Sequence, residues 1–178
     1  MRTVRKNRLI ADETGAAVIE LALVAPVLAL MTIGVIDISN AYGRKLALEQ
    51  GAQRAIEKVM QTTGSTTVQS TIKTEAVCQV NGMNSDGSCK TSPISASNVT
   101  VTYRQECMDS AGTITARTNT DASVFDTYVC GTGTVTEAKY LEVLVTDKYA
   151  PMFSTHFAGY NTSDGTYHIS ATAGMRTK

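Results

Sequence analysis

The chain has 178 residues, of which 43% are hydrophobic, and its 16 basic and 16 acidic residues give no formal net charge. Because there is no net basic field, the composition gives no reason to expect a nucleic-acid partner or an acidic substrate. The length is that of one domain, or of one domain joined to a separately behaving segment.

The apolar residues are concentrated near the N-terminus, in a nearly unbroken run of about 21 residues from Ala16 to Ile36. As a helix rising about 1.5 Å per residue, such a run is roughly 31 Å long, which matches a bilayer core of about 30 Å. A cleavable secretory signal has a shorter apolar region of about 7 to 15 residues. We therefore predict that residues 16–37 form a transmembrane helix.

Basic residues lie mainly before this run. The first dozen residues after it contain only Arg44 and Lys45, whereas four basic residues precede it: Arg2, Arg5, Lys6 and Arg8. Positively charged flanks stay on the cytoplasmic side of a membrane. The sequence thus predicts a single-pass protein of a bacterial inner membrane, with a cytoplasmic N-terminus and a periplasmic C-terminal domain.

Glu20 is the only charged residue inside the run. A carboxylate within a membrane helix costs on the order of 3 kcal/mol on insertion scales, so it needs a compensating role. If the chain were cut after Gly15, Ala16 would carry a new ammonium group on the same helix face as Glu20, four residues away. That amine could neutralise the carboxylate within one subunit or on a neighbour. The alternative is an uncut anchor whose Glu20 reaches the membrane interface.

At Gly15, Ala16 and Glu20 the sequence resembles the signal of type IV pilins and pseudopilins, in which a basic leader ends in Gly and the fifth mature residue is Glu. The longer segment 15–57 resembles the TadE-like proteins of the Tad (Flp) pilus assembly system. These share Gly-Ala-x-x-x-Glu, a Pro within the apolar run, then an acidic residue, a Tyr and an Ala-rich stretch. In this chain the later positions of that pattern, from the Pro to the Ala-rich stretch, are occupied by Pro26, Asp37, Tyr42, Gln50 and Ala52.

This resemblance implies that residues 1–15 are a leader removed by a prepilin peptidase, and that Glu20 takes part in docking the subunit into a filament. The implied partners are the membrane, the peptidase, other pilin or pseudopilin subunits and the assembly platform. The implied function is that of a minor pilin or pseudopilin that helps to initiate or cap the pilus. Major subunits of this class are usually far shorter than this chain.

Beyond the run, apolar residues recur at helical spacing: Ile38, Tyr42, Leu46, Ile56 and either Val59 or Met60. This pattern predicts an amphipathic continuation of the helix over residues 38–64, with its apolar stripe packed on the outer domain and its end at Gly64.

Two residue types affect the geometry of this helix. Pro26 removes one backbone hydrogen bond and should bend or loosen the helix. Gly34, Gly43 and Gly51 would allow close helix contacts, or are neutral small residues.

Residues 65–178 are predicted to form an outer β-rich domain with two disulfides, because an exported domain with an even number of cysteines usually pairs them. Sequential pairing is favoured, since each bond then closes a short loop: Cys78 with Cys89, and Cys107 with Cys130. Four free thiols or a metal cluster are the alternative, although the spacing resembles no zinc site.

Alternating apolar residues predict four antiparallel strands, because the connections are mostly too short for crossover helices. Thr66–Gln79 is expected to be a short helix or an irregular arm. The strands are predicted in Asn98–Cys107, Ser123–Cys130, Lys139–Thr146 and Tyr167–Met175. The predicted fold class is therefore α+β, with a long N-terminal helix packed on a small antiparallel sheet, like a lollipop.

The sequence carries no recognisable catalytic pattern. His156 and His168 are the only histidines, and neither a nucleophile elbow nor a Gly-rich phosphate loop is present. We expect neither an enzyme nor a cofactor, metal or small-molecule substrate. Two functions remain: a processed pilus subunit, or an uncleaved membrane-anchored protein whose outer domain binds or adheres to an envelope component.

Overall fold

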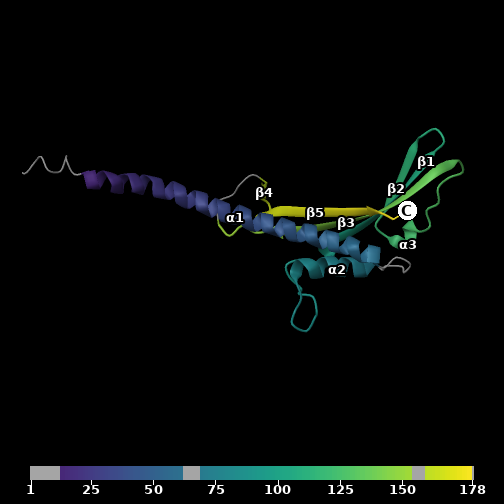
Figure 1. Cartoon of the computed structure of the whole chain (residues 1–178), viewed down its shortest axis with the longest axis horizontal. Coiled ribbons are helices and arrows are strands. Elements are labelled where there is room, and N and C mark those ends of the chain that lie inside the picture. The colour runs from purple at the N-terminus through teal and green to yellow at the C-terminus, as the bar shows by residue number, and fades with distance from the viewer. Residues whose placement is uncertain (1–12, 62–68, 154–158, 178) are drawn as a thin grey trace, which may run out of the picture.

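The computed structural model describes residues 13–61, 69–153 and 159–177. Its elements are α1 (Glu13–Gln61), α2 (Gln69–Asn81), the 3-10 turn η1 (Ala96–Asn98), β1 (Val99–Asp109), β2 (Ile114–Asn119), α3 (Ala122–Phe125), β3 (Thr134–Tyr149), β4 (Tyr160–Asn161) and β5 (Thr166–Arg176). The molecule is elongated, with the N-terminal half of α1 projecting away from everything else (Figure 1).

α1 is one continuous helix of 49 residues that runs through Pro26. As expected, the helix therefore continues without a break beyond the apolar run. The predicted stop at Gly64 and the histidine at position 156 lie outside the described residues.

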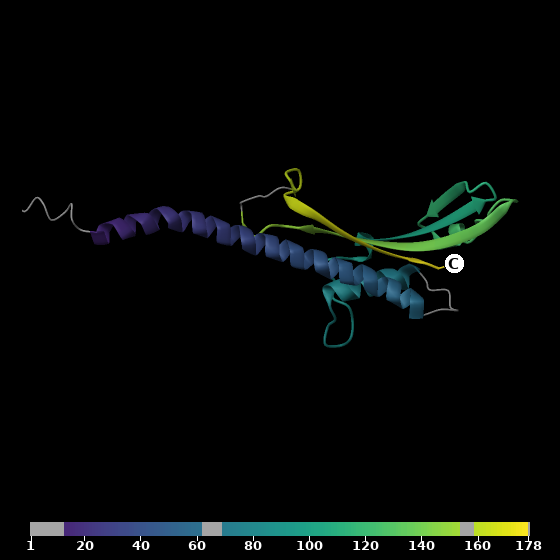
Figure 2. The same ribbon diagram turned by 45° about the horizontal axis from the view of Figure 1, so that its top comes forward.

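The five strands form one antiparallel sheet in the order β2-β1-β3-β5-β4. β3 has 16 residues and is central, so it pairs along its length with β1 on one side and β5 on the other. The sheet curls, and its β1–β2 end turns away from α1 (Figure 2). A long helix against an antiparallel sheet is the α+β arrangement that the sequence predicted.

The core lies between the sheet and the C-terminal half of α1, with α2 beside it. α1 packs on β3 and β5, and α2 packs on α1 and β1. Apolar residues alternate inward along the strands, as expected for a sheet with one covered face. The core residues are Leu48, Ala52, Ala55, Ile56, Ile72, Ala76, Ile94, Val99, Val101, Leu141, Val143, Val145 and Ala171.

The face of α1 that packs on the sheet differs from the predicted one. Ile38, Tyr42 and Leu46 are 55%, 61% and 41% exposed, so the predicted stripe is wrong over these residues, although Ile56 is buried. The buried face is instead lined by small and polar residues as well as apolar ones: Asp37, Leu48, Gly51, Ala52 and Ala55. Small side chains allow the helix to approach its neighbours closely, but they give little hydropathy signal.

The predicted strand Ser123–Cys130 is also wrong, because its first residues form α3. The Asp121 carboxylate caps this helix by accepting hydrogen bonds from the Ser123 backbone N–H at 2.9 Å and its hydroxyl at 2.7 Å. Phe125 is buried and stacks on the Tyr103 ring. The capping signal therefore outweighs the short alternating pattern. The other three predicted strands overlap β1, β3 and β5, with only Asn98 of the first lying outside, in η1, whereas β2 and β4 were not predicted.

Gly51 and Gly43 offer a matched test of close packing on α1. A Cβ at position 51 would lie 2.5 Å from Val80 Cγ2 and 3.0 Å from the Ala76 carbonyl oxygen, whereas a Cβ at position 43 would meet nothing within 4 Å. We expect Gly51→Ala to lower the free energy of unfolding by about 1–3 kcal/mol, because overpacking outweighs the gain in helix propensity. Gly43→Ala should raise it by up to about 1 kcal/mol. Urea denaturation of the full chain in detergent measures both, and equal effects would contradict the close approach.

Candidate functional site

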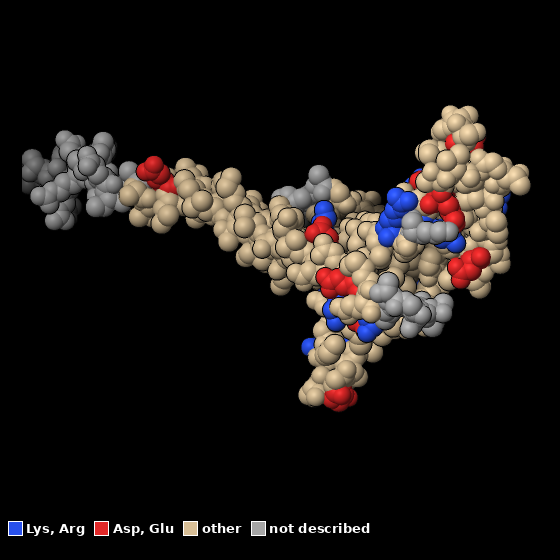
Figure 3. Space-filling model, turned by 45° about the vertical axis from the view of Figure 1, so that its right-hand side comes forward, with Lys and Arg blue, Asp and Glu red and all other residues tan. Residues whose placement is uncertain are grey.

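The projecting half of α1 is apolar and exposed. Val18, Leu23 and Met31 are 68%, 72% and 65% exposed, and residues 17–32 are exposed throughout. Figure 3 shows this part almost without charged side chains except for acidic ones near its beginning. α1 is long and apolar enough over Ala17–Gln61 to cross a membrane, which is compatible with a single-pass anchor. Such an apolar surface, uncovered by the rest of the chain, requires a lipid or protein environment.

Glu20 lies on this projecting half and is exposed. Within the described residues nothing hydrogen bonds to it or forms an ion pair with it. Gly15 and Ala16 also belong to α1, which begins at Glu13 rather than at Ala16. The Gly15–Ala16 bond therefore lies in the first helical turn, where backbone N–H groups have no acceptor within the helix. The backbone of Ala16 is one helical turn from that of Glu20.

Asp37 joins α1 to the end of β3 at the point where the apolar run stops. Its side chain is only 3% exposed. Oδ1 accepts hydrogen bonds from the Met152 backbone N–H at 2.9 Å and from the Tyr149 hydroxyl at 3.3 Å, and Oδ2 accepts one from the Phe153 N–H at 3.3 Å. A buried carboxylate needs such donors. Asp37 thus attaches the segment after β3 to the helix.

Tyr149, the hydroxyl donor to Asp37, has a raised pKa. Burial first, and then the negative charge of Asp37 and the hydrogen bond to it, raise the pKa of Tyr149 above its ordinary value. Tyrosine is ordinarily protonated at neutral pH, and the raised pKa keeps the phenol a donor to Asp37 into more alkaline solution.

A second polar contact lies about two turns further along α1. Arg44 Nε is 2.8 Å from Asp147 Oδ2, with the two side chains 29% and 8% exposed. The buried Asp147 also accepts a hydrogen bond from the Lys148 backbone N–H at 2.8 Å. An unpaired carboxylate at this depth would be strongly unfavourable. Together with the contacts of Asp37, this ion pair prevents β3 from sliding along α1.

The two disulfides stabilise the outer part of the domain. Cys78 at the end of α2 bonds to Cys89 with a Cα–Cα distance of 4.9 Å, and Cys107 of β1 bonds to Cys130 at 5.7 Å. These are the pairings favoured from the sequence. Each bond attaches a turn-rich segment to a regular element, so it restricts chain that has few hydrophobic contacts of its own.

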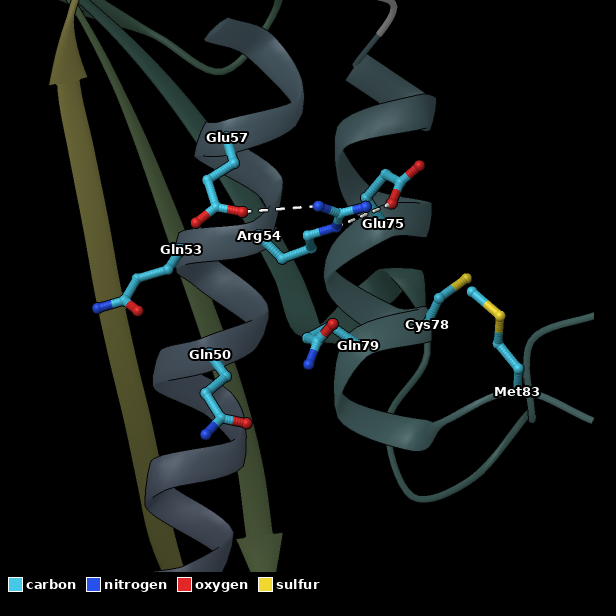
Figure 4. Close-up of a pocket in the computed structure, with 8 residues that line it drawn as sticks. All are labelled: Gln50, Gln53, Arg54, Glu57, Glu75, Cys78, Gln79 and Met83. Carbon is cyan, nitrogen blue, oxygen red and sulfur yellow. Dashed lines mark ion pairs between the residues drawn. The ribbon is translucent and has the colours of Figure 1, made fainter. Parts of the chain in front are cut away.

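A polar cleft of about 350 Å³ lies between α1 and α2. Figure 4 shows Arg54 of α1 reaching across it, and its guanidinium lies 3.6 Å from Glu57 and 3.8 Å from Glu75. Lys58 also pairs with Glu75, at 3.2 Å. Because these charges pair with one another, the cleft is best described as a polar seam between two helices. Its lining is Gln50, Gln53, Arg54, Glu57, Glu75, Cys78, Gln79 and Met83.

The sequence predicted roles for Gly15, Ala16, Glu20, Pro26 and the cysteines but did not assign the contacts of Asp37. An acidic residue directly after an apolar run was the available signal, although its partners are more than a hundred positions away in the chain. Glu20 and Asp37 are both in α1 but lie about 25 Å apart along the helix axis. The projecting helix and the junction at Asp37 are therefore separate parts of the site.

Comparison with known proteins gives one result. No curated protein and no solved structure matches the chain. Residues 15–56 match the model of a protein family described as TadE-like protein. The matched residues include Glu20 and Asp37, so they cover the exposed half of α1 and its junction with the sheet. Over this segment the chain is similar to the TadE-like proteins.

Proposed function

We propose that the chain is a minor pilin or pseudopilin that takes part in assembling a Tad-type pilus, in its initiation or at its tip. The observation that carries the proposal is the projecting, exposed apolar half of α1 with Glu20 as its one internal charge, within the TadE-like segment. A helix of this kind can reside first in the bilayer and then among the helices of other subunits. No catalytic role is proposed.

Processing after Gly15 would prepare α1 for this role. The bond to be cut lies in the first turn, which unwinds at little cost because its N–H groups are not bonded within the helix. Gly15 is exposed, so a peptidase in the membrane could reach it. The cut leaves an ammonium group on Ala16, one turn from Glu20.

The new ammonium group would pair with a Glu20 carboxylate. At about 4 Å and an effective dielectric constant near 20, opposite unit charges attract by on the order of 4 kcal/mol. This attraction is comparable with the insertion cost of about 3 kcal/mol for a carboxylate in a membrane helix. A pair between neighbouring subunits would therefore both neutralise Glu20 and set the height at which a new subunit docks.

The orientation follows from charge. The basic residues before the apolar run would remain in the cytoplasm, and the sheet and both disulfides would lie on the periplasmic side, where cysteines are oxidised. The partners in this proposal are the prepilin peptidase, other pilin or pseudopilin subunits and the proteins of the assembly platform.

The processing step can be tested by intact mass and N-terminal sequencing of the chain from membranes and from sheared pili. We expect the mature chain to begin at Ala16. Gly15→Val should retain the leader, because a branched side chain would obstruct the cut, whereas Gly43→Val should be processed normally. Neither position has any atom within 4 Å of an added Cβ, so the two variants are matched for packing. A leader still attached in surface-assembled material would contradict the proposal and support an uncleaved membrane-anchored binding protein.

A further inference from the structure

The end of the sheet nearest the projecting half of α1 carries apolar and aromatic side chains, which we call the proximal rim. Its members are Tyr149, Met152, Phe153, Tyr160 and Tyr167. The rings of Tyr149 and Tyr167 are 6.5 Å apart between centroids, and those of Tyr160 and Tyr167 are 5.5 Å apart. Met152 is 69% exposed and Phe153 36% exposed. The proximal rim is therefore an apolar and aromatic group at the end of the sheet that faces the projecting half of α1.

Hydrogen bonds fix the height of the proximal rim along α1. The backbone N–H groups of Met152 and Phe153 donate to Asp37, and the Asn40 amide donates to Met152 Sδ at 3.4 Å. The turn from Asp37 to Asn40 lies within about 6 Å of the end of the apolar run at Ile36. The interfacial layer of a bilayer is about 5–8 Å thick on each side. If the run fills the hydrocarbon core, the proximal rim lies at the depth of this layer.

The chemistry of the proximal rim suits that depth. Tyrosine is enriched at membrane interfaces because its ring is apolar and its hydroxyl is polar. The nearby charges balance one another, since Asp164 lies 2.9 Å from Lys148 Nζ and 2.6 Å from His168 Nε2. Contact with lipid would therefore depend on apolar insertion and little on the charge of the headgroups. Because α1 already holds the domain at the bilayer, a weak affinity is sufficient.

We infer that the proximal rim is a second membrane contact of this protein, in which Met152 and Phe153 enter the boundary between headgroups and acyl chains. This inference rests on the proposal that α1 spans a bilayer. Two separated contacts would fix the rotation of the outer domain about α1. Each subunit would then present the same face to its neighbours before assembly.

Fluorescence quenching by lipid can test this contact in the full chain. All four cysteines are in disulfides, so an introduced cysteine is the only thiol available for labelling. Met152→Cys, Val135→Cys and Leu28→Cys would each carry an environment-sensitive fluorophore. The chain would be reconstituted in phosphatidylcholine vesicles at about one chain per vesicle, with bromine on some lipids near the headgroup end of the acyl chains, for positions 152 and 135, and on others near the middle of the bilayer, for position 28. Val135 is 67% exposed and so matches Met152, but it lies near the opposite end of β3, roughly 46 Å from Tyr149 along the strand.

We expect brominated lipid to quench the label at position 152 by roughly twofold more than the label at position 135. Adding anionic lipid should change this ratio little. Equal quenching at positions 152 and 135, with strong quenching at position 28, would overturn the membrane contact while leaving the anchor intact. A blue-shifted emission at position 152 without quenching by bromine would also overturn it, because a protein surface would then cover the rim. Absence of quenching at position 28 would instead overturn the proposed anchor itself.

Discussion

Replacing Glu20 with Ala should reduce incorporation of this chain into pili by tenfold or more, while leaving it inserted in the membrane and folded. Removing the carboxylate eliminates an insertion cost of about 3 kcal/mol, so insertion itself should become easier. What is lost is the acceptor for the ammonium group of a neighbouring subunit. The amount of chain in the sheared pilus fraction, compared with the amount in the membrane fraction, measures this effect. Glu20→Gln should behave like Glu20→Ala if charge is decisive.

Glu49→Ala is the matched control. Glu49 is also a carboxylate on α1 and is 43% exposed, but it lies outside the apolar run and its closest cation is Lys45 at 4.0 Å. Such an exposed pair contributes little. Normal incorporation of the Glu49 variant together with loss of the Glu20 variant would locate the effect at the apolar part of α1. Normal incorporation of both variants would contradict the docking role of Glu20.

The features that the sequence predicted well are those with one-dimensional signals. The length of the Ala16–Ile36 run requires a helix, and partial alternation of apolar residues in β1, β3 and β5 marks strands with one buried face. The disulfide pairing followed from the short loops that each bond closes. At the candidate site, Gly15 and Glu20 were predicted because a charge and a small residue at the edge of an apolar run are local features, and their roles stay predictions.

The remaining features depend on contacts between distant segments. The buried face of α1 is made by Gly51, Ala52 and Ala55, whose small size matters only because α2 and the sheet lie against them. Likewise, the role of Asp37 depends on backbone groups 115 and 116 positions away. A hydropathy pattern cannot identify such positions, since it records the polarity of a side chain and not the distance to its partner.

The junction and the projecting helix have different physical requirements. Glu20 lies on an exposed apolar surface that only lipid or another protein could cover. Asp37, by contrast, has hydrogen-bond donors from its own chain and stabilises the fold. The TadE-like segment, residues 15–56, includes both. Under the proposed function, the segment would combine a surface for assembly with the attachment that holds the outer domain at a fixed height on α1.

Replacing Asp37 with Ala should detach the segment after β3 from α1. Three donors would lose their acceptor at a site that is 3% exposed, and we expect a local cost of about 3 kcal/mol. Hydrogen exchange at the amides of Met152 and Phe153 in the full chain should then be faster by about 100-fold. Asp37→Asn keeps one oxygen acceptor and should give an intermediate rate, while Ala at the exposed Ser39 should change nothing. If Val143 in the core exchanged equally fast, the loss would be global and the local attachment would be contradicted. A local loss should also reduce lipid quenching at position 152, because the proximal rim would no longer be held at the height of Asp37.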